Sequence, residues 1–169
     1  MAKSINDPNT NSDPELSALP LESGGADKAD LVSLLLFEVD GESYAIGVET
    51  TEGVVDCPRL TPLPGAPVGV AGLASVRGRM TVVMNLGSGT AQEDVKRRLI
   101  LVKGDAQLGL LADRVDGVLG LAPKRVRPVA HGRNNLTAKR AKFVWPAKSY
   151  FKSRTHRVPI IDVERLGEA

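Results

Sequence analysis

Few residues in this chain have side chains suited to catalysis or metal binding. There is one cysteine, Cys57, and there are two histidines, His131 and His156. Both histidines lie among basic residues, with no cysteine or glutamate at the spacing of metal ligands, so we expect solvated surface residues. Ser75 does not stand in a Gly-x-Ser-x-Gly motif, which would expose a nucleophilic serine on a sharp turn. The sequence therefore predicts no catalytic, cofactor-binding or metal-binding residue, and we expect a protein that is not an enzyme.

A glycine-containing stretch, GLASVRGR at residues 72–79, carries the remaining candidate. It does not fit a phosphate-binding loop, because its two glycines are one residue too far apart and Arg79 replaces the required lysine. It also lies between two strand-like runs and does not lead into a helix. Arg77 would instead occupy a hairpin turn, where its planar guanidinium could bind a partner's carboxylates or carbonyls. The alternative is an ordinary turn residue, either solvated or in an intramolecular salt bridge.

Length and composition indicate what positions this turn. The chain has 169 residues, which suits one domain or two small subdomains, and its hydrophobic content of 42% allows a sizeable core. Residues 1–29 are rich in Asn, Asp, Pro, Ser and Gly and lack apolar periodicity. Such a segment buries too little surface to offset its ordering entropy, so we predict a disordered arm followed by a domain over residues 30–169.

The rest of the chain reads as short strands separated by glycine- and proline-containing turns. The strand-like runs cover residues 31–39, 43–48, 68–76, 79–86, 96–121 (as a hairpin turning at 104–107), 143–151 and 158–163. Asp40-Gly41 favours a tight hairpin turn, and the prolines of residues 59–67 predict a loop that cannot donate to a sheet. In residues 79–86, one set of alternate residues is Met80, Val82, Met84 and Leu86, and the other is Arg79, Thr81, Val83 and Asn85. This period of two predicts a half-buried strand. Asp162 could cap a short final helix. This pattern favours an all-β barrel or a pair of barrels.

Three segments, in order, resemble the CheW family of chemotaxis coupling proteins. The first is YAIGVETTEGVVDCPRLTPLPGAPVGVAGLASVRGRMTVVMNL, the second is LLADRVDGVLGLAPKRVRP and the third is VPIIDVERL. The resemblance covers about residues 31–169. It implies an all-β fold of two small five-stranded SH3-like barrels packed together, with a short C-terminal helix.

The resemblance also implies an adaptor without catalytic activity or cofactor. Such a cytoplasmic protein links the tips of membrane-bound chemoreceptors to the regulatory domain of a CheA-like histidine kinase, in an array that controls flagella or type IV pili. One barrel would dock a kinase barrel end to end, and a groove near the junction would hold the receptor's helical hairpin. Arg77 matches the arginine of the family's "NLRG" turn and would lie beside Gly72 and Ser75. The implied partner-binding residues are Val48, Thr51, Glu52, Val54, Gly72, Ser75, Val76, Arg77, Gly78, Val115, Asp116 and Val118.

A different class of function, nucleic-acid binding, is favoured by the second half of the chain. Residues 120–169 hold twelve basic and three acidic side chains, whereas residues 1–30 hold two basic and six acidic ones. Small barrels that bind nucleic acid combine positive charge with aromatic stacking platforms. Phe143, Trp145, Tyr150 and Phe151 lie within the basic segment. This interpretation explains nothing about residues 31–86, so the adaptor is the preferred hypothesis.

Overall fold

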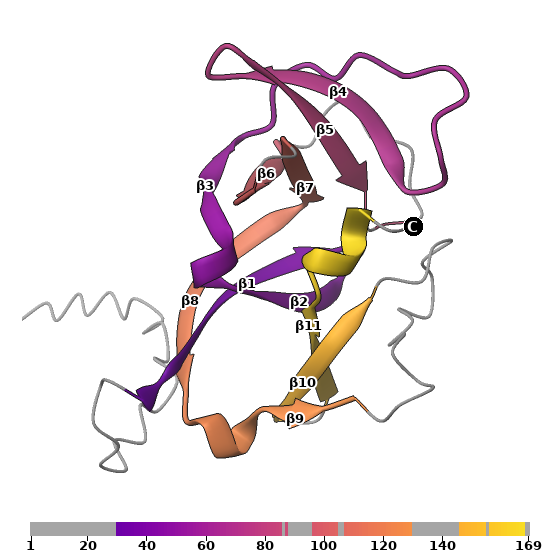
Figure 1. Ribbon diagram of the computed structural model, residues 1–169. Coiled ribbons are helices and arrows are strands. Elements are labelled where there is room, and N and C mark those ends of the chain that lie inside the picture. The colour runs from indigo at the N-terminus through magenta and orange to yellow at the C-terminus, as the bar shows by residue number, and fades with distance from the viewer. Residues whose placement is uncertain are drawn as a thin grey trace, which may run out of the picture.

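The computed structural model describes residues 30–85, 87, 96–104, 107–129, 146–154 and 156–167 (Figure 1). The disordered arm predicted for residues 1–29 lies outside the described residues and stays a prediction. The same holds for residues 130–145, which include His131, Phe143 and Trp145.

The described part of the chain consists of strands joined by short turns. The strands are β1 (Val32–Val39), β2 (Glu42–Gly47), β3 (Thr51–Asp56), β4 (Val70–Val76), β5 (Arg79–Asn85), β6 (Arg98–Val102), β7 (Leu108–Ala112), β8 (Arg114–Leu121), β9 (Arg127–Pro128), β10 (Ala147–Ser153) and β11 (His156–Ile161). Single 3₁₀ turns are η2 (Val48–Thr50), η3 (Pro123–Arg125) and η4 (Glu164–Gly167). No helix of these described residues is long and apolar enough to cross a membrane.

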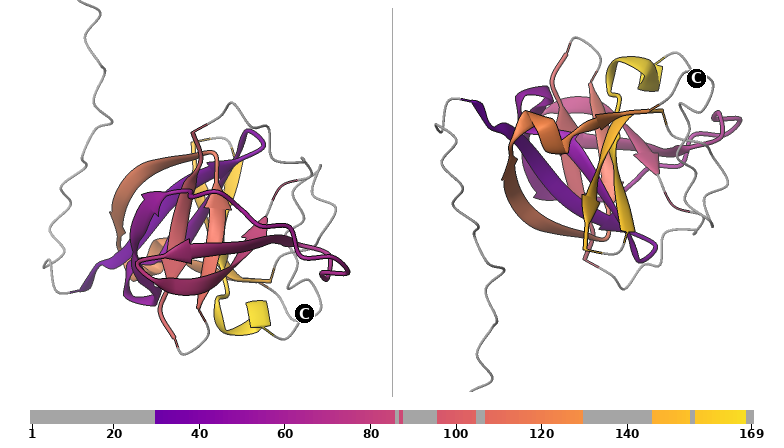
Figure 2. Two further views of the ribbon diagram at one scale, coloured as in Figure 1. Left: turned by 90° about the horizontal axis from the view of Figure 1, so that it is seen from above. Right: turned by 90° about the horizontal axis from the view of Figure 1, so that it is seen from below.

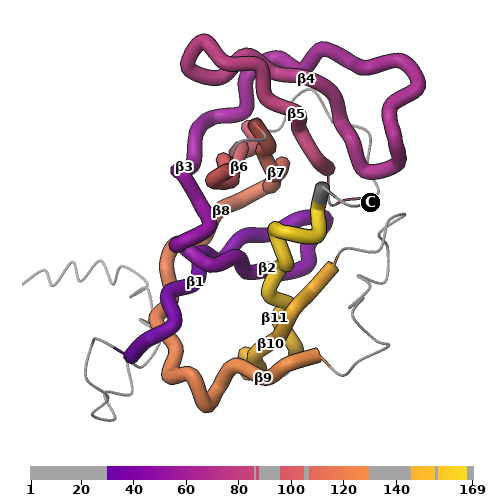
Figure 3. The backbone as a smooth tube through the Cα atoms, viewed as in Figure 1, coloured from indigo at the N-terminus to yellow at the C-terminus, as the bar shows by residue number. Residues whose placement is uncertain are grey.

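The strands form two curved sheets, which confirms the predicted pair of small barrels. The first sheet has the order β8-β1-β2-β11-β10-β9, in which β9 is a two-residue addition, and the second has the order β3-β6-β7-β5-β4. The chain leaves the first barrel after β2, builds the whole second barrel and returns through β8, as the path in Figure 3 shows. The views from above and below show the strong twist of both sheets (Figure 2).

Three core clusters of described residues explain why several strands are apolar on both faces. One cluster fills the first barrel and includes Leu34 and Phe151, and another fills the second barrel and includes Leu99 and Leu101. The third lies between the sheets and joins Phe37 of β1 to Ile100 of β6. Because successive side chains of β6 point alternately into the second barrel and into the junction, its LILV run is buried throughout.

The two barrels are also joined by a polar contact near this junction. The side chain of Asp113, between β7 and β8, accepts a hydrogen bond from the backbone N–H of Asp40 at 2.8 Å through Oδ2. Its other oxygen, Oδ1, lies 3.2 Å from Nε of Arg97, just before β6. The β1–β2 turn of the first barrel is therefore held to the second barrel.

The hairpins agree with the sequence interpretation. Val39 pairs with Glu42 across Asp40-Gly41, and both turn residues have positive φ angles, 51° and 77°. This is the backbone of a two-residue turn for which Asp-Gly is a favoured sequence. The hairpin predicted over residues 96–121 forms at its turn, with Val102 paired to Leu108, but its second arm ends at Ala112 and the following strand, β8, belongs to the first sheet.

The prediction for the proline loop needs correction, whereas the short C-terminal helix is present. The proline loop does donate to a sheet, because the backbone N–H of Thr61 bonds the carbonyl of Leu73 at 2.8 Å and the reverse bond also forms. Thr61 escapes the predicted restriction because it precedes Pro62 and keeps its own N–H. The C-terminal helix is a single 3₁₀ turn, and it places Leu166 in the core between the sheets.

The orientation expected for β5 is reversed over its first half. Thr81 and Val83 point into the second barrel and are 2% and 0% exposed, whereas Met80 and Val82 face outward and Met80 is 63% exposed. Met84 is buried, but in the core between the sheets. The alternation is present, but the core between the sheets covers Met84 and does not extend to the first half of β5. Met80 and Val82 are therefore left at the surface.

Candidate partner-binding surface at the open end of the second barrel

Arg77 lies at the tip of the β4–β5 hairpin. Val76 pairs with Arg79, so Arg77 and Gly78 form a two-residue turn, with φ angles of 50° and 78°. Glycine takes such angles at no cost and asparagine or aspartate takes them readily, whereas a long side chain is strained there. The hairpin would therefore accept Asn-Gly more easily than the Arg-Gly it has. Local backbone preference does not explain an arginine at this position.

Glu52 faces Arg77 from β3, and a β-bulge directs it there. Thr51 pairs with Val102 and Gly53 pairs with Leu101, so Glu52 is the additional residue of the bulge. Bulges redirect a side chain and increase the local twist of a strand. Oε1 of Glu52 lies 3.9 Å from Nη1 of Arg77, and the two side chains are 44% and 61% exposed. The pair is long and open to solvent.

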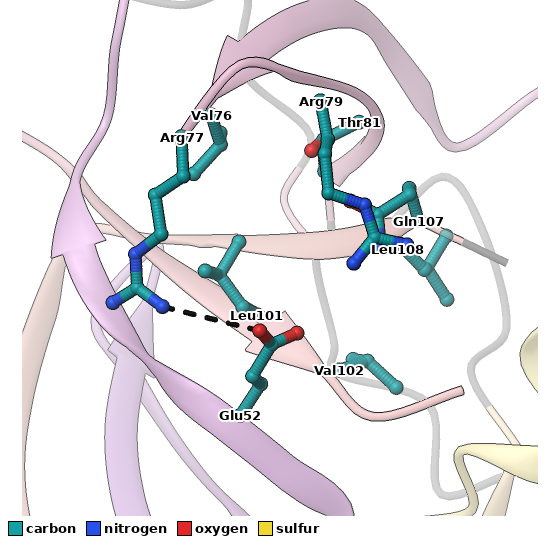
Figure 4. A pocket seen from close by; sticks show the side chains of 9 residues that line it. All are labelled: Glu52, Val76, Arg77, Arg79, Thr81, Leu101, Val102, Gln107 and Leu108. Carbon is teal, nitrogen blue, oxygen red and sulfur yellow. Dashed lines mark ion pairs between the residues drawn. The ribbon is translucent and has the colours of Figure 1, made fainter. Parts of the chain in front are cut away.

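A shallow recess opens beneath this pair at the end of the second barrel (Figure 4). In Figure 4, Arg77 and Glu52 lie on one side of the recess, and Arg79 lies on the other near Gln107 and Leu108. The remaining lining residues are Val76, Thr81, Leu101 and Val102. The floor is thus largely apolar and the rim is charged, with two arginines and one carboxylate.

The structure brings only part of the predicted site together here. Glu52, Val76 and Arg77 line the recess, and Ser75 and Gly78 lie beside Arg77 on the same hairpin. The side chain of Val76 is buried in the core of the second barrel, so its contribution to a surface is indirect. Val54 is exposed two residues after Glu52 on β3.

Gly72 does not contribute to an exposed surface beside Arg77, contrary to the expectation. It is buried, its φ angle is 146°, and a Cβ atom there would collide with the carbonyl oxygen of Thr61. Glycine is required at position 72 because the proline loop approaches β4 too closely for a side chain.

The other predicted residues lie at the junction of the two barrels. Val48 of η2 and Val115 of β8 are partly buried and pack against the core between the sheets. The hydroxyl of Thr51 donates a hydrogen bond to the carbonyl of Val48 at 2.9 Å. Val118, on the outer face of β8, is 64% exposed. These residues therefore form a second group, on the edge strand of the first sheet and the crossover into β3.

Asp116 is held in place by Arg114. Nε of Arg114 donates to Oδ1 of Asp116 at 2.7 Å, and Nη2 of the same arginine donates to Glu38 at 2.8 Å. The hydrogen bond to Asp116, together with the charges of Asp116 and Glu38, raises the pKa of Arg114 further above its ordinary value. A partner at β8 would meet a positioned carboxylate.

Several surface residues were missed by the sequence interpretation. Arg79 and Gln107 line the recess, and Met80 and Val82 are exposed on the opposite, outer face of β5. Arg79 had been expected to begin an ordinary polar face. The alternation places Met80 and Val82 on one face of the strand, but whether that face is buried or exposed shows only once the direction of the core is known.

The geometry favours neither a reactive cysteine nor a metal site among the described residues. Burial raises the pKa of the Cys57 thiol, and the nearby Arg97 only partly opposes this, so the thiol stays protonated at neutral pH. In the described ranges of the chain, no three side chains among His, Cys, Asp and Glu gather closely enough to hold a metal ion. The arrangement of charged rim and apolar floor is suited to binding a protein surface.

Comparison with known proteins agrees with this reading. A family model described as "CheW-like domain" matches residues 33–169, which span both barrels. The chain is 29% identical over 147 residues to "Chemotaxis protein CheW" of Thermotoga maritima, a match that covers 85% of this chain and 92% of that protein. The crystal structure of the scaffolding protein TtCheW from Thermoanaerobacter tengcongensis has a similar fold, with a TM-score of 0.66 at 19% identity. That match covers 82% of this chain and 94% of the other.

Proposed function

Because the chain belongs to the CheW-like domain family, we propose that it is a non-catalytic adaptor of a chemosensory signalling array. It couples the cytoplasmic tips of membrane-bound chemoreceptors to the regulatory domain of a CheA-like histidine kinase, in the cytoplasm and without a cofactor. The output of the array is the control of flagella or of type IV pili.

The observation that carries this proposal is the exposed end of the second barrel. Arg77 occupies a strained turn position, and within the described part of the chain its ion pair is a long, exposed one with Glu52. Met80 and Val82 add exposed apolar surface on the outer face of β5, the strand that follows this turn. Arginine and methionine are enriched at protein interfaces, and a buried arginine is often a hot spot. A kinase barrel that docks here would cover the apolar side chains and offer a carboxylate or carbonyl to Arg77.

The receptor would bind at the junction of the barrels, next to β8. Val118 and Val54 supply exposed apolar contacts, and Asp116 supplies a charge held by Arg114. A helical hairpin presents both apolar and cationic side chains, so it complements this mixture. Val48, Thr51 and Val115 support the surface from beneath, because their side chains are partly buried.

The proposal is tested by calorimetric titration of the full chain with two fragments. One is the regulatory domain of a histidine kinase encoded beside it, and the other is the helical tip of a receptor from the same genome. We expect each fragment to bind alone, and both to bind together, because Arg77 of the β4–β5 turn and Val118 of β8 belong to different sheets. Arg77→Ala is expected to weaken kinase binding, and Val118→Glu is expected to weaken receptor binding.

The matched control is Arg98→Ala. Arg98 of β6 pairs with Asp56 of β3 at 2.7 Å, at the opposite end of β3 from Glu52. Its loss should leave both affinities unchanged. Failure of the wild-type chain to bind either fragment would overturn the proposed function. Equal weakening by Arg77→Ala and Arg98→Ala would move the kinase surface away from the recess.

A further inference from the structure

The outer face of β9, β10 and β11 carries a set of exposed cations. Tyr150 lies opposite both Arg127 and Pro159, and Lys152 lies opposite Arg157. Directly opposed residues share one face of a sheet, as do residues two apart on a strand. Phe151 and Val158, the intervening residues, point into the core of the first barrel. Arg127, Lys152 and Arg157 are therefore exposed together on the outer face, which we call the basic face.

No carboxylate of the described residues forms an ion pair with this basic face. Arg77, Arg97, Arg98 and Arg114 each have an acidic partner within 4 Å, whereas Arg127, Lys152 and Arg157 have none among the described residues. The guanidinium of Arg157 instead lies 5.0 Å from the ring centroid of Tyr150. A guanidinium stacked on an aromatic ring keeps its N–H edge free to bind an anion.

The N-terminal segment of the same chain has the complementary charge. Residues 1–29 contain two lysines and five acidic side chains, Asp7, Asp13, Glu15, Glu22 and Asp27. Their excess of negative charge matches the excess of positive charge on the basic face.

This segment also joins the domain at the correct end. Val32, at the start of β1, pairs with Leu121, the last residue of β8. Leu121 is followed by η3, which carries Lys124 and Arg125, and then by β9 with Arg127. Figure 1 shows the beginning of β1, η3 and β9 at the same end of the first barrel. A coil of this length has an end-to-end distance of about 30 Å. Neighbouring strands of a sheet lie ~5 Å apart, so the segment is long enough to reach β9, β10 and β11 from the start of β1.

From these observations we propose that residues 1–29 bind the basic face of their own domain. The carboxylates of the segment pair with Arg127, Lys152 and Arg157. Covalent attachment gives the segment an effective concentration in the millimolar range, so contacts that are individually weak suffice for occupancy. The basic face is then covered by an acidic peptide from the same chain, and external polyanions must displace it.

The proposal is tested in the full chain with a nitroxide spin label. The label is attached through Ser17→Cys in a Cys57→Ser background, and the amide signals of the domain are recorded by two-dimensional NMR. We expect the label to broaden the signals of Tyr150, Lys152 and Arg157 at about 0.02 M salt and to leave that of Arg77 sharp. The broadening should disappear at about 0.5 M salt, because exposed ion pairs are screened.

Two matched double variants test whether the contact depends on the basic face itself or on exposed positive charge anywhere on the domain. Lys152→Gln with Arg157→Gln should remove the broadening. Arg59→Gln with Lys103→Gln, which changes two exposed cations of the second barrel, should preserve it. Uniform broadening, or none on the basic face, would overturn the proposal. So would binding of a single-stranded DNA to the basic face by a chain whose segment shows no contact with it, because the face would then serve an external polyanion.

Discussion

Nη1 of Arg77 and Oε1 of Glu52 meet across the open end of the second barrel at 3.9 Å. A strained hairpin turn supplies the first side chain and a β-bulge supplies the second. An exposed pair of this length contributes at most about 1 kcal/mol to stability. The intramolecular salt bridge considered from the sequence therefore exists, but stability does not account for it. We infer that both side chains are positioned for a partner.

The reversed orientation of β5 leads to a prediction on stability. Val83→Ala should lower the free energy of unfolding by about 2 kcal/mol, because it removes two buried methyl groups and leaves a cavity. Met80→Ala should change it by less than about 0.5 kcal/mol, because Met80 is exposed. Urea unfolding of both variants measures this. A larger effect for Met80 than for Val83 would contradict the orientation.

A second prediction concerns alkaline pH. Burial in the core between the sheets, followed by the negative charges of Glu42 and Asp40, raises the pKa of the Tyr44 phenol above its ordinary value of 10.0. The folded state therefore holds this proton more tightly than the unfolded state does. The resulting stability is complete below pH 10 and is lost as the pH rises above that value.

Tyr44→Phe removes this titration and keeps the contact with Phe37, whose ring centroid lies 5.8 Å away. The variant should lose stability less steeply than the wild-type chain in thermal melts between about pH 9 and pH 11. Parallel pH profiles for the two proteins would show that Tyr44 ionises as freely in the folded state as in the unfolded one.

A third prediction tests the contact between the proline loop and β4. Gly72→Ala should destabilise the fold by at least about 2 kcal/mol, because it adds a clash with the carbonyl of Thr61 to an unfavourable φ angle. Gly65→Ala is the control, since Gly65 also has a positive φ angle, 72°, but nothing lies within 4 Å of the added atom. It should cost about 1 kcal/mol. Equal losses would mean that the loop moves away from β4 at little cost.

The sequence was sufficient for features that depend on local pattern. The Asp40-Gly41 turn, the turn between β6 and β7 and the all-β fold were predicted, because turn residues and alternation act over a few positions. The choice of two packed barrels over one came from the family resemblance. The position of Arg77 in a turn was predicted for the same reason.

Features that depend on distant contacts were not predictable. The direction of Glu52 follows from its register with β6, which no local pattern specifies. The burial of Gly72 depends on Thr61, eleven residues earlier, and the inward position of Thr81 depends on where the core of the second barrel ends. The local sequence allowed either face of these strands to be buried, and long-range packing determined which one is.

The central claim is that Arg77 is present for a partner and not for the fold. Arg77→Asn tests it most directly, because asparagine suits the left-handed turn angle better than arginine does. Calorimetric titration with the kinase regulatory domain should be combined with thermal melts, and Arg98→Asn should serve as the control. We expect Arg77→Asn to melt at or above the wild-type temperature and to bind the kinase domain about 30-fold more weakly, which corresponds to ~2 kcal/mol. Wild-type affinity in a folded Arg77→Asn protein would contradict the account.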